Sequence, residues 1–183
     1  MENCFCIWDD LENPNNGLNL VSNPLITKML VPINQTNMKD LVDLIRDKHL
    51  DGGIEVNPPA TLSDIAHFER KIGFSLPKDF REFYLTCNGF GCNEDIFNMV
   101  PLQEIRQYQQ DYGDNWFYFS EYMIYSDMWG LRRTITGQFE IFNGSYSDKI
   151  MTSSLTEFLQ IFLKGDVFET GGLYEWHEEL GIK

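Results

Sequence analysis

The sequence predicts an α+β domain: an antiparallel sheet with packed helices at both ends of the domain. Apolar residues recur with helical spacing between residues 59 and 89, alternate as in strands between about residues 96 and 151, and return to helical spacing after residue 153. Consecutive strands joined by short turns favour antiparallel pairing. Helices that are segregated from the strands along the chain are typical of the α+β class.

Two short helices are predicted between Pro59 and Gly89. Thr61 can cap the first helix, and Asp64 stands where it completes a capping box. Gly73 ends this helix, because glycine tolerates the left-handed conformation of a C-cap. Pro77 marks the start of the second helix, where its missing N–H costs nothing. The apolar stripes of the two helices are Ile65, Phe68 and Ile72, and then Phe80, Phe83, Tyr84 and Cys87.

The remaining elements follow from the same patterns. A short amphipathic helix is predicted from Met38 to about His49, and a final helix begins after Ser153 or Ser154 and ends at Gly165. The segment 103–111 predicts a further short helix. Strands are predicted at 96–102, 116–119, 122–126, 129–135, 138–142 and 149–151, with turns at Thr136-Gly137 and Asn143-Gly144.

These elements suggest three zones. Residues 1–53 form an N-terminal extension with one short helix, residues 54–165 form the main domain, and residues 166–183 form an acidic C-terminal tail that packs on the domain or extends it. A chain of 183 residues is long enough to bury one proper core.

The helical pair carries a combination of residues that resembles the SUKH superfamily, which contains the fungal Smi/Knr cell-wall regulators and many bacterial immunity proteins. The matching residues are Ile65, Glu69, Gly73, Leu76, Pro77, Asp79, Phe80, Phe83, Asn88 and Gly89. The likeness continues through 97–105 and ends with Ser154, Leu155, Glu157, Phe158 and Leu159, so that it spans roughly residues 54–165. It implies a SUKH-like α+β fold and a non-enzymatic, protein-binding role.

Composition narrows the classes of partner. The 28 acidic and 14 basic side chains give a formal net charge of −14 and a pI near 4.5. Nucleic acids and anionic membrane surfaces are recognised by clustered Lys and Arg, so neither is an expected partner. A basic protein would be attracted, although surplus acid also serves solubility alone. The apolar runs are too short for a membrane span, and the acidic N-terminus lacks an export signal, so we expect a cytoplasmic protein.

No catalytic or metal-binding pattern is legible. Cys4 and Cys6 are too close for the usual zinc pair, and Cys87 lies on an apolar stripe. The three histidines stand in no nucleophile motif, and no phosphate-binding or dinucleotide-binding glycine pattern occurs. We therefore expect no enzyme activity, no metal and no cofactor.

One segment suggests a binding surface. Nine of the 22 residues from Tyr108 to Trp129 are aromatic, and the segment holds four acids and no Lys or Arg. A strand buries one face, so some of these rings should stay accessible beside acids, although they could instead fill the core. The hypothesis places the partner-binding surface at Asp114, Trp116, Tyr118, Asp127 and Trp129, with the acidic tail at 175–179 as the next candidate.

The resemblance implies an immunity protein that binds a cognate bacterial toxin, with a basic toxin domain as partner, and occludes its active site. The alternative is an intracellular regulatory scaffold without a toxin partner, like the fungal members. A hydrolase that uses the surplus carboxylates is the weakest interpretation.

Overall fold

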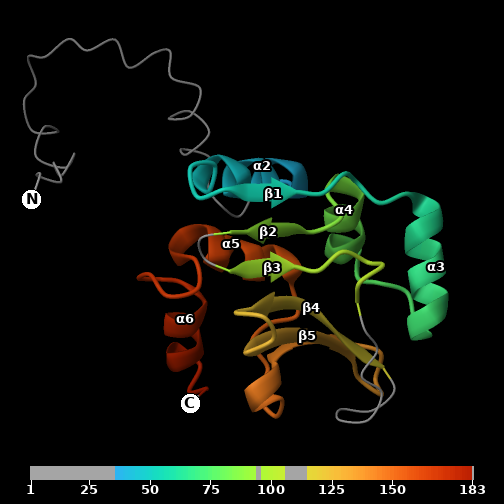
Figure 1. Ribbon diagram of the computed structural model, residues 1–183. Coiled ribbons are helices and arrows are strands. Elements are labelled where there is room, and N and C mark those ends of the chain that lie inside the picture. The colour runs from blue at the N-terminus through green and yellow to red at the C-terminus, as the bar shows by residue number, and fades with distance from the viewer. Residues whose placement is uncertain (1–35, 94–95, 106–114, 183) are drawn as a thin grey trace, which may run out of the picture. The chain divides into compact units, whose positions relative to one another are not determined.

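The computed structural model describes residues 36–93, 96–105 and 115–182, which belong to the compact unit Thr36–Lys183. Within these ranges five α-helices accompany a six-stranded antiparallel sheet (Figure 1), which confirms the predicted α+β class. The elements are α2 (Met38–Lys48), β1 (Ile54–Val56), α3 (Leu62–Ile72), α4 (Lys78–Thr86), β2 (Phe90–Cys92), β3 (Phe97–Met99), β4 (Trp116–Tyr122), β5 (Asp127–Arg133), β6 (Phe139–Asn143), the 3-10 helix η4 (Gly144–Tyr146), α5 (Leu155–Gly165) and α6 (Leu173–Glu179).

Helix α3 has both predicted ends, and α4 has the predicted start. The Thr61 side chain accepts a hydrogen bond from the backbone N–H of Asp64, and the Asp64 carboxylate accepts one from the backbone N–H of Thr61. Gly73 ends α3 in the left-handed conformation, with φ of 80°. Pro77 directly precedes α4. Local sequence therefore decides both ends of α3 and the start of α4, whereas α4 ends at Thr86, before Asn88-Gly89.

The sheet is a meander in which each strand pairs with its neighbour along the chain, in the order β1 to β6. Strands β1 and β2 were not predicted from the sequence. Both strands have only three residues, and their register is set by pairs such as Glu55 with Gly91. Three residues carry no readable alternation, so these strands exist because of pairing between distant parts of the chain.

The strand predicted at 122–126 is wrong, because this segment is the turn between β4 and β5. Tyr122 pairs with Asp127 across the hairpin. The three residues that follow Tyr122 all adopt positive φ, with 48° at Met123, 53° at Ile124 and 66° at Tyr125. Their apolar, strand-like composition suggested extended backbone, but the chain must reverse here to pair β4 with β5.

The strand predicted at 149–151 and the helix predicted at 103–111 do not form in the described residues. The strand predicted at 149–151 is replaced by a single bridge between Ile141 and Thr152, because the preceding 3-10 helix delays the return of the chain to the sheet. Of the helix predicted at 103–111, residues 103–105 follow β3 without helical structure, and residues 106–114 lie outside the described part of the chain.

One face of the sheet carries the apolar core, and the other carries a row that includes polar residues. Residues paired across antiparallel strands point to the same face, so the register assigns each side chain. The inner face contributes Phe90, Phe97, Met99, Phe117, Phe119, Trp129, Leu131 and Ile141 to one core, which also contains buried residues of all five helices. The outer face carries the cross-strand row Glu55, Gly91, Asn98, Glu121 and Met128.

The two ends of the described chain join this core. Leu41 and Ile45 of α2 are buried in it, as are Leu173 and Trp176 of α6. No helix was predicted in the tail at 166–183, but α6 forms there. The helix of the N-terminal extension and the tail thus share one core with residues 54–165.

Candidate functional site

The residues of the recognised motif hold the scaffold together. The Glu69 carboxylate accepts hydrogen bonds from the Leu76 backbone N–H (2.9 Å) and from Arg81 Nη1 (3.0 Å), so it fixes the elbow between α3 and α4. The Asn88 side chain accepts from the Leu102 backbone N–H at 3.0 Å. Gly89 has φ of 84°, and a Cβ there would lie 2.2 Å from the Met99 carbonyl oxygen. These groups make structural bonds, so the motif specifies the fold.

Asp79, also in the motif, acts on a distant helix. One of its carboxylate oxygens accepts from the backbone N–H of Leu155 at 2.6 Å and of Thr156 at 3.3 Å, and from Ser154 Oγ at 3.2 Å. A carboxylate at a helix N-terminus satisfies orphan N–H groups and complements the positive helix end. Asp79 therefore joins α4 to the start of α5.

The four described residues of the predicted partner surface, Trp116, Tyr118, Asp127 and Trp129, do not form one face. Asp114 lies outside the described residues. Trp129 is completely buried on the inner face, and Trp116 is 3% exposed and packs against Tyr118 and Phe142 on the outer face. The expectation that the two tryptophans are accessible is therefore wrong for this fold, because both rings are needed to fill space against other aromatics. Tyr118 remains partly exposed, on the outer face.

Asp127 is partly buried and holds the tail of the chain. Its carboxylate accepts from Tyr174 Oη (2.6 Å) and from Asn143 Nδ2 (2.8 Å). Trp129 Nε1 donates to His177 Nε2 at 3.1 Å, so β5 binds α6 through two adjacent bonds. Burial lowers the pKa of His177, against the opposing effect of Asp127, and so favours the neutral imidazole that accepts this bond. The role visible for Asp127 is to dock α6.

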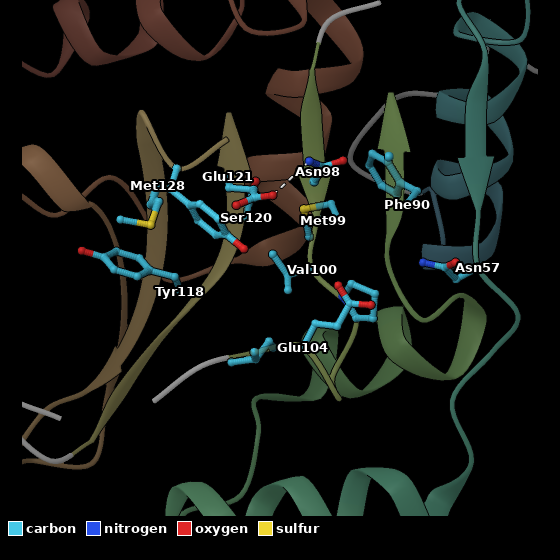
Figure 2. Close-up of a pocket in the computed structure, with 14 residues that line it drawn as sticks. Asn57, Phe90, Asn98, Met99, Val100, Glu104, Tyr118, Ser120, Glu121 and Met128 are labelled. Atoms are coloured by element: carbon cyan, nitrogen blue, oxygen red, sulfur yellow. Dashed lines mark hydrogen bonds between the residues drawn. The ribbon is translucent and has the colours of Figure 1, made fainter. Parts of the chain in front are cut away.

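A hollow of about 270 Å³ opens on the outer face of the sheet. Figure 2 shows Asn98 and Glu121 side by side at its centre, Tyr118 and Met128 on the β4–β5 side and Asn57 on the opposite side. Glu104, in the segment after β3, also lines it. No Lys or Arg is among its described lining residues. This hollow is the candidate site.

The centre of the hollow is organised by one hydrogen bond. Asn98 Nδ2 donates to Glu121 Oε1 at 3.0 Å, between neighbouring positions of β3 and β4. On the other side of Asn98, Gly91 leaves the space for this side chain, because a Cβ there would lie 2.7 Å from Asn98 Oδ1. Asn57 Nδ2 donates to the Asn88 carbonyl oxygen at 3.2 Å. Both amides thus use their nitrogens within the protein and retain oxygens that can accept hydrogen bonds.

The β4–β5 turn provides apolar side chains beside the hollow. Met123, Ile124 and Tyr125 are 47%, 79% and 50% exposed, and Tyr125 lines the hollow. Positive φ outside glycine costs roughly 1–3 kcal/mol per residue, and such strain is concentrated at functional sites. Exposed apolar residues in a strained turn are typical of a binding surface.

The sequence hypothesis located only part of this hollow. It named Tyr118, which lines the hollow, but Asn57, Asn98 and Glu104 lie outside the aromatic run 108–129, and assigning side chains to a face of the sheet requires the strand register. A weaker signal was present: Asn98 and Glu121 are polar residues within otherwise apolar strands, so they point away from the core.

Three candidate reactive side chains, Ser120, Cys87 and His67, lie in different elements: β4, the C-cap of α4, and α3. Ser120 Oγ is buried and lacks a hydrogen-bond partner there, but Ser120 pairs with Met99 and Trp129 and so points to the core. Burial raises the pKa of the Cys87 thiol to about 12, so that it stays protonated at neutral pH. His67 is exposed on α3.

The described ranges contain neither a candidate metal centre nor a candidate membrane span. There, no group of three or more His, Cys, Asp or Glu residues could hold a metal ion. In the same part of the chain, no helix is long and apolar enough to cross a membrane.

Comparison with known proteins agrees with the fold and with the motif. No curated protein sequence matches the chain. The sequence profile of the SMI1 / KNR4 family (SUKH-1) matches residues 59–161, from the entry into α3 to the middle of α5. The match covers more than half of the chain and includes the residues, from Glu69 to Gly89, whose structural bonds are described above. The chain therefore belongs to the SMI1 / KNR4 family (SUKH-1).

Proposed function

We propose that this chain is a non-enzymatic immunity protein that binds a cognate bacterial toxin in the cytoplasm and occludes its active site. The family includes immunity proteins, and this makes toxin binding the first function to consider. The observation that carries the proposal is the hollow on the outer face, which combines carboxylates, amides and aromatic rings and has no basic residue among its described lining.

The charge of the chain suits this role. A formal net charge of −14 attracts basic proteins over long range and raises the rate of encounter. Enzymes that act on nucleic acids bind phosphates through clustered Lys and Arg, so the active-site cleft of a nuclease toxin is basic. An acidic face that covers such a cleft blocks the substrate without any chemistry of its own.

Co-expression tests the proposal. The toxic domain encoded by the neighbouring gene is produced in bacteria with and without this chain, and colony survival is counted. We expect survival to depend on the chain, and the two purified proteins to form a stable complex in which the toxin is inactive. As a matched control, a destabilised variant such as Phe83→Ala should protect less, in proportion to the folded protein that remains.

A different result would favour the scaffold alternative. If the chain neither protects cells nor binds the neighbouring gene product, toxin neutralisation is refuted, and a regulatory partner without toxicity becomes the leading explanation. Turnover of a substrate by the purified chain would contradict the non-enzymatic part of the proposal.

A further inference from the structure

We infer that the hollow on the outer face binds an arginine side chain presented by a basic partner protein, with the β4–β5 turn as the adjoining apolar contact. The inference rests on the proposed function in one respect: it takes the partner to be a protein. It goes further in naming the pocket, the recognised group and the residues that recognise it.

The polar groups of the hollow select a cation. Glu104 supplies a carboxylate, Glu121 adds a second negative charge while its Oε1 accepts from Asn98, and Asn57 and Asn98 supply amide oxygens, since each uses its amide nitrogen to donate to Asn88 or Glu121. All of these groups accept hydrogen bonds, and a guanidinium offers five N–H donors and no acceptor. An anionic ligand would meet like charge and find no Lys or Arg in the described lining.

The shape and the aromatic walls favour arginine over other cations. At about 270 Å³ the hollow is smaller than a pocket for a drug-sized ligand, roughly 300–1,000 Å³, so it suits a single long side chain. Tyr118 and Tyr125 line it, and a planar guanidinium stacks on aromatic rings better than an ammonium does.

The neighbouring turn argues for a protein and against a small polyamine. Met123 and Ile124 expose apolar surface next to Tyr125, which itself lines the hollow. A partner that fills the hollow and covers this turn must offer a cationic side chain and apolar surface together. Arginine is accordingly among the residues enriched at protein interfaces and their energetic centres.

The test uses the full-length chain labelled with ¹⁵N and a small probe, N-acetyl-arginine methylamide. We expect the probe to shift the NMR signals of Gly91 and of the Asn57 and Asn98 side-chain amides in a saturable way, with a Kd on the order of millimolar for so small a ligand. The neutral isostere N-acetyl-citrulline methylamide should leave these signals nearly unchanged.

Matched variants separate the local effect from general charge. The double variant E104Q/E121Q removes two charges at the hollow and should weaken binding of the arginine probe roughly tenfold, because the negative charge that attracts the guanidinium is lost. The control E178Q/E179Q removes two charges from exposed glutamates of α6 that do not line the hollow, and should leave the affinity unchanged.

Several results would overturn the inference. Equal shifts with citrulline, no saturable shift with arginine, or an equal loss of affinity in E178Q/E179Q would each do so. Saturable binding of spermidine without binding of the arginine probe would assign the hollow to polyamines instead. If a toxin is bound equally well by E104Q/E121Q, this inference fails while the proposed function stands. If the arginine probe binds as expected but no toxin is neutralised, the proposed function fails and the pocket assignment stands.

Discussion

The carboxylate of Asp79 should stabilise the fold through α5, and Asp79→Ala tests this. The substitution removes the acceptor of the Leu155 and Thr156 backbone N–H groups, bonded at 2.6 and 3.3 Å. Loss of an N-terminal cap costs roughly 0.5–2 kcal/mol, and hydrogen bonds to a charged group contribute about 1.5–3 kcal/mol. Ser154 remains the N-cap of α5 in this variant, since its side chain accepts a hydrogen bond from the backbone N–H of Glu157. We therefore expect a total loss of about 2–3 kcal/mol.

Urea denaturation followed by circular dichroism measures this loss as a change in the free energy of unfolding. The melting temperature should fall by roughly 2–4 °C for each kcal/mol in a chain of this size. Asp148→Ala is the matched control, because Asp148 is exposed and no side-chain bond is seen for it within the described residues. The control should stay within about 0.5 kcal/mol of the unmodified protein. If Asp79→Ala changes the free energy of unfolding as little as the control does, the link between α4 and α5 does not stabilise the fold.

Three further changes test the core, a turn and a buried base. Phe83 is fully buried, so Phe83→Ala should cost about 3–5 kcal/mol, and a change below ~1 kcal/mol in the urea midpoint analysis would remove it from the core. Gly89→Ala should destabilise the protein by more than roughly 1 kcal/mol, because its Cβ would lie 2.2 Å from the Met99 carbonyl oxygen; unchanged thermal unfolding would refute this. The lowered pKa of His177 implies that the unfolded chain takes up the proton first, so stability should fall as the pH drops from the ordinary value of about 6.5 toward the lower folded pKa, by at most about 1.4 kcal/mol per pH unit. His177→Gln, which can still accept from Trp129, should lose less stability than the unmodified protein between pH 7.5 and 5.5, and an identical loss would show that His177 does not cause it.

Much of the scaffold could be predicted from residues that are close together in the sequence. The ends of α3 follow from Thr61, Asp64 and Gly73, whose caps need only a few residues on either side. The family motif was legible because its residues are close in sequence. Acidity, and with it the class of partner to expect, follows from composition alone.

The tertiary structure decided which side chains are available for binding. Trp129 belonged to an aromatic run that suggested a surface, but pairing with Ser120 places it on the inner face, where it is fully buried. The turn Met123–Tyr125 had the composition of a strand, and it reverses direction because β4 must pair with β5.

The candidate site has the same origin. Asn98 meets Glu121 and Gly91 only because β3 lies between β2 and β4 in one particular register, and a shift of one residue would turn Asn98 toward the core. The sequence by itself thus determined the helical caps, the α+β class, the family motif and the charge, which depend on local spacing and composition. The hollow and its polar lining depend on the pairing of residues far apart in the chain, and only the folded sheet brings them together.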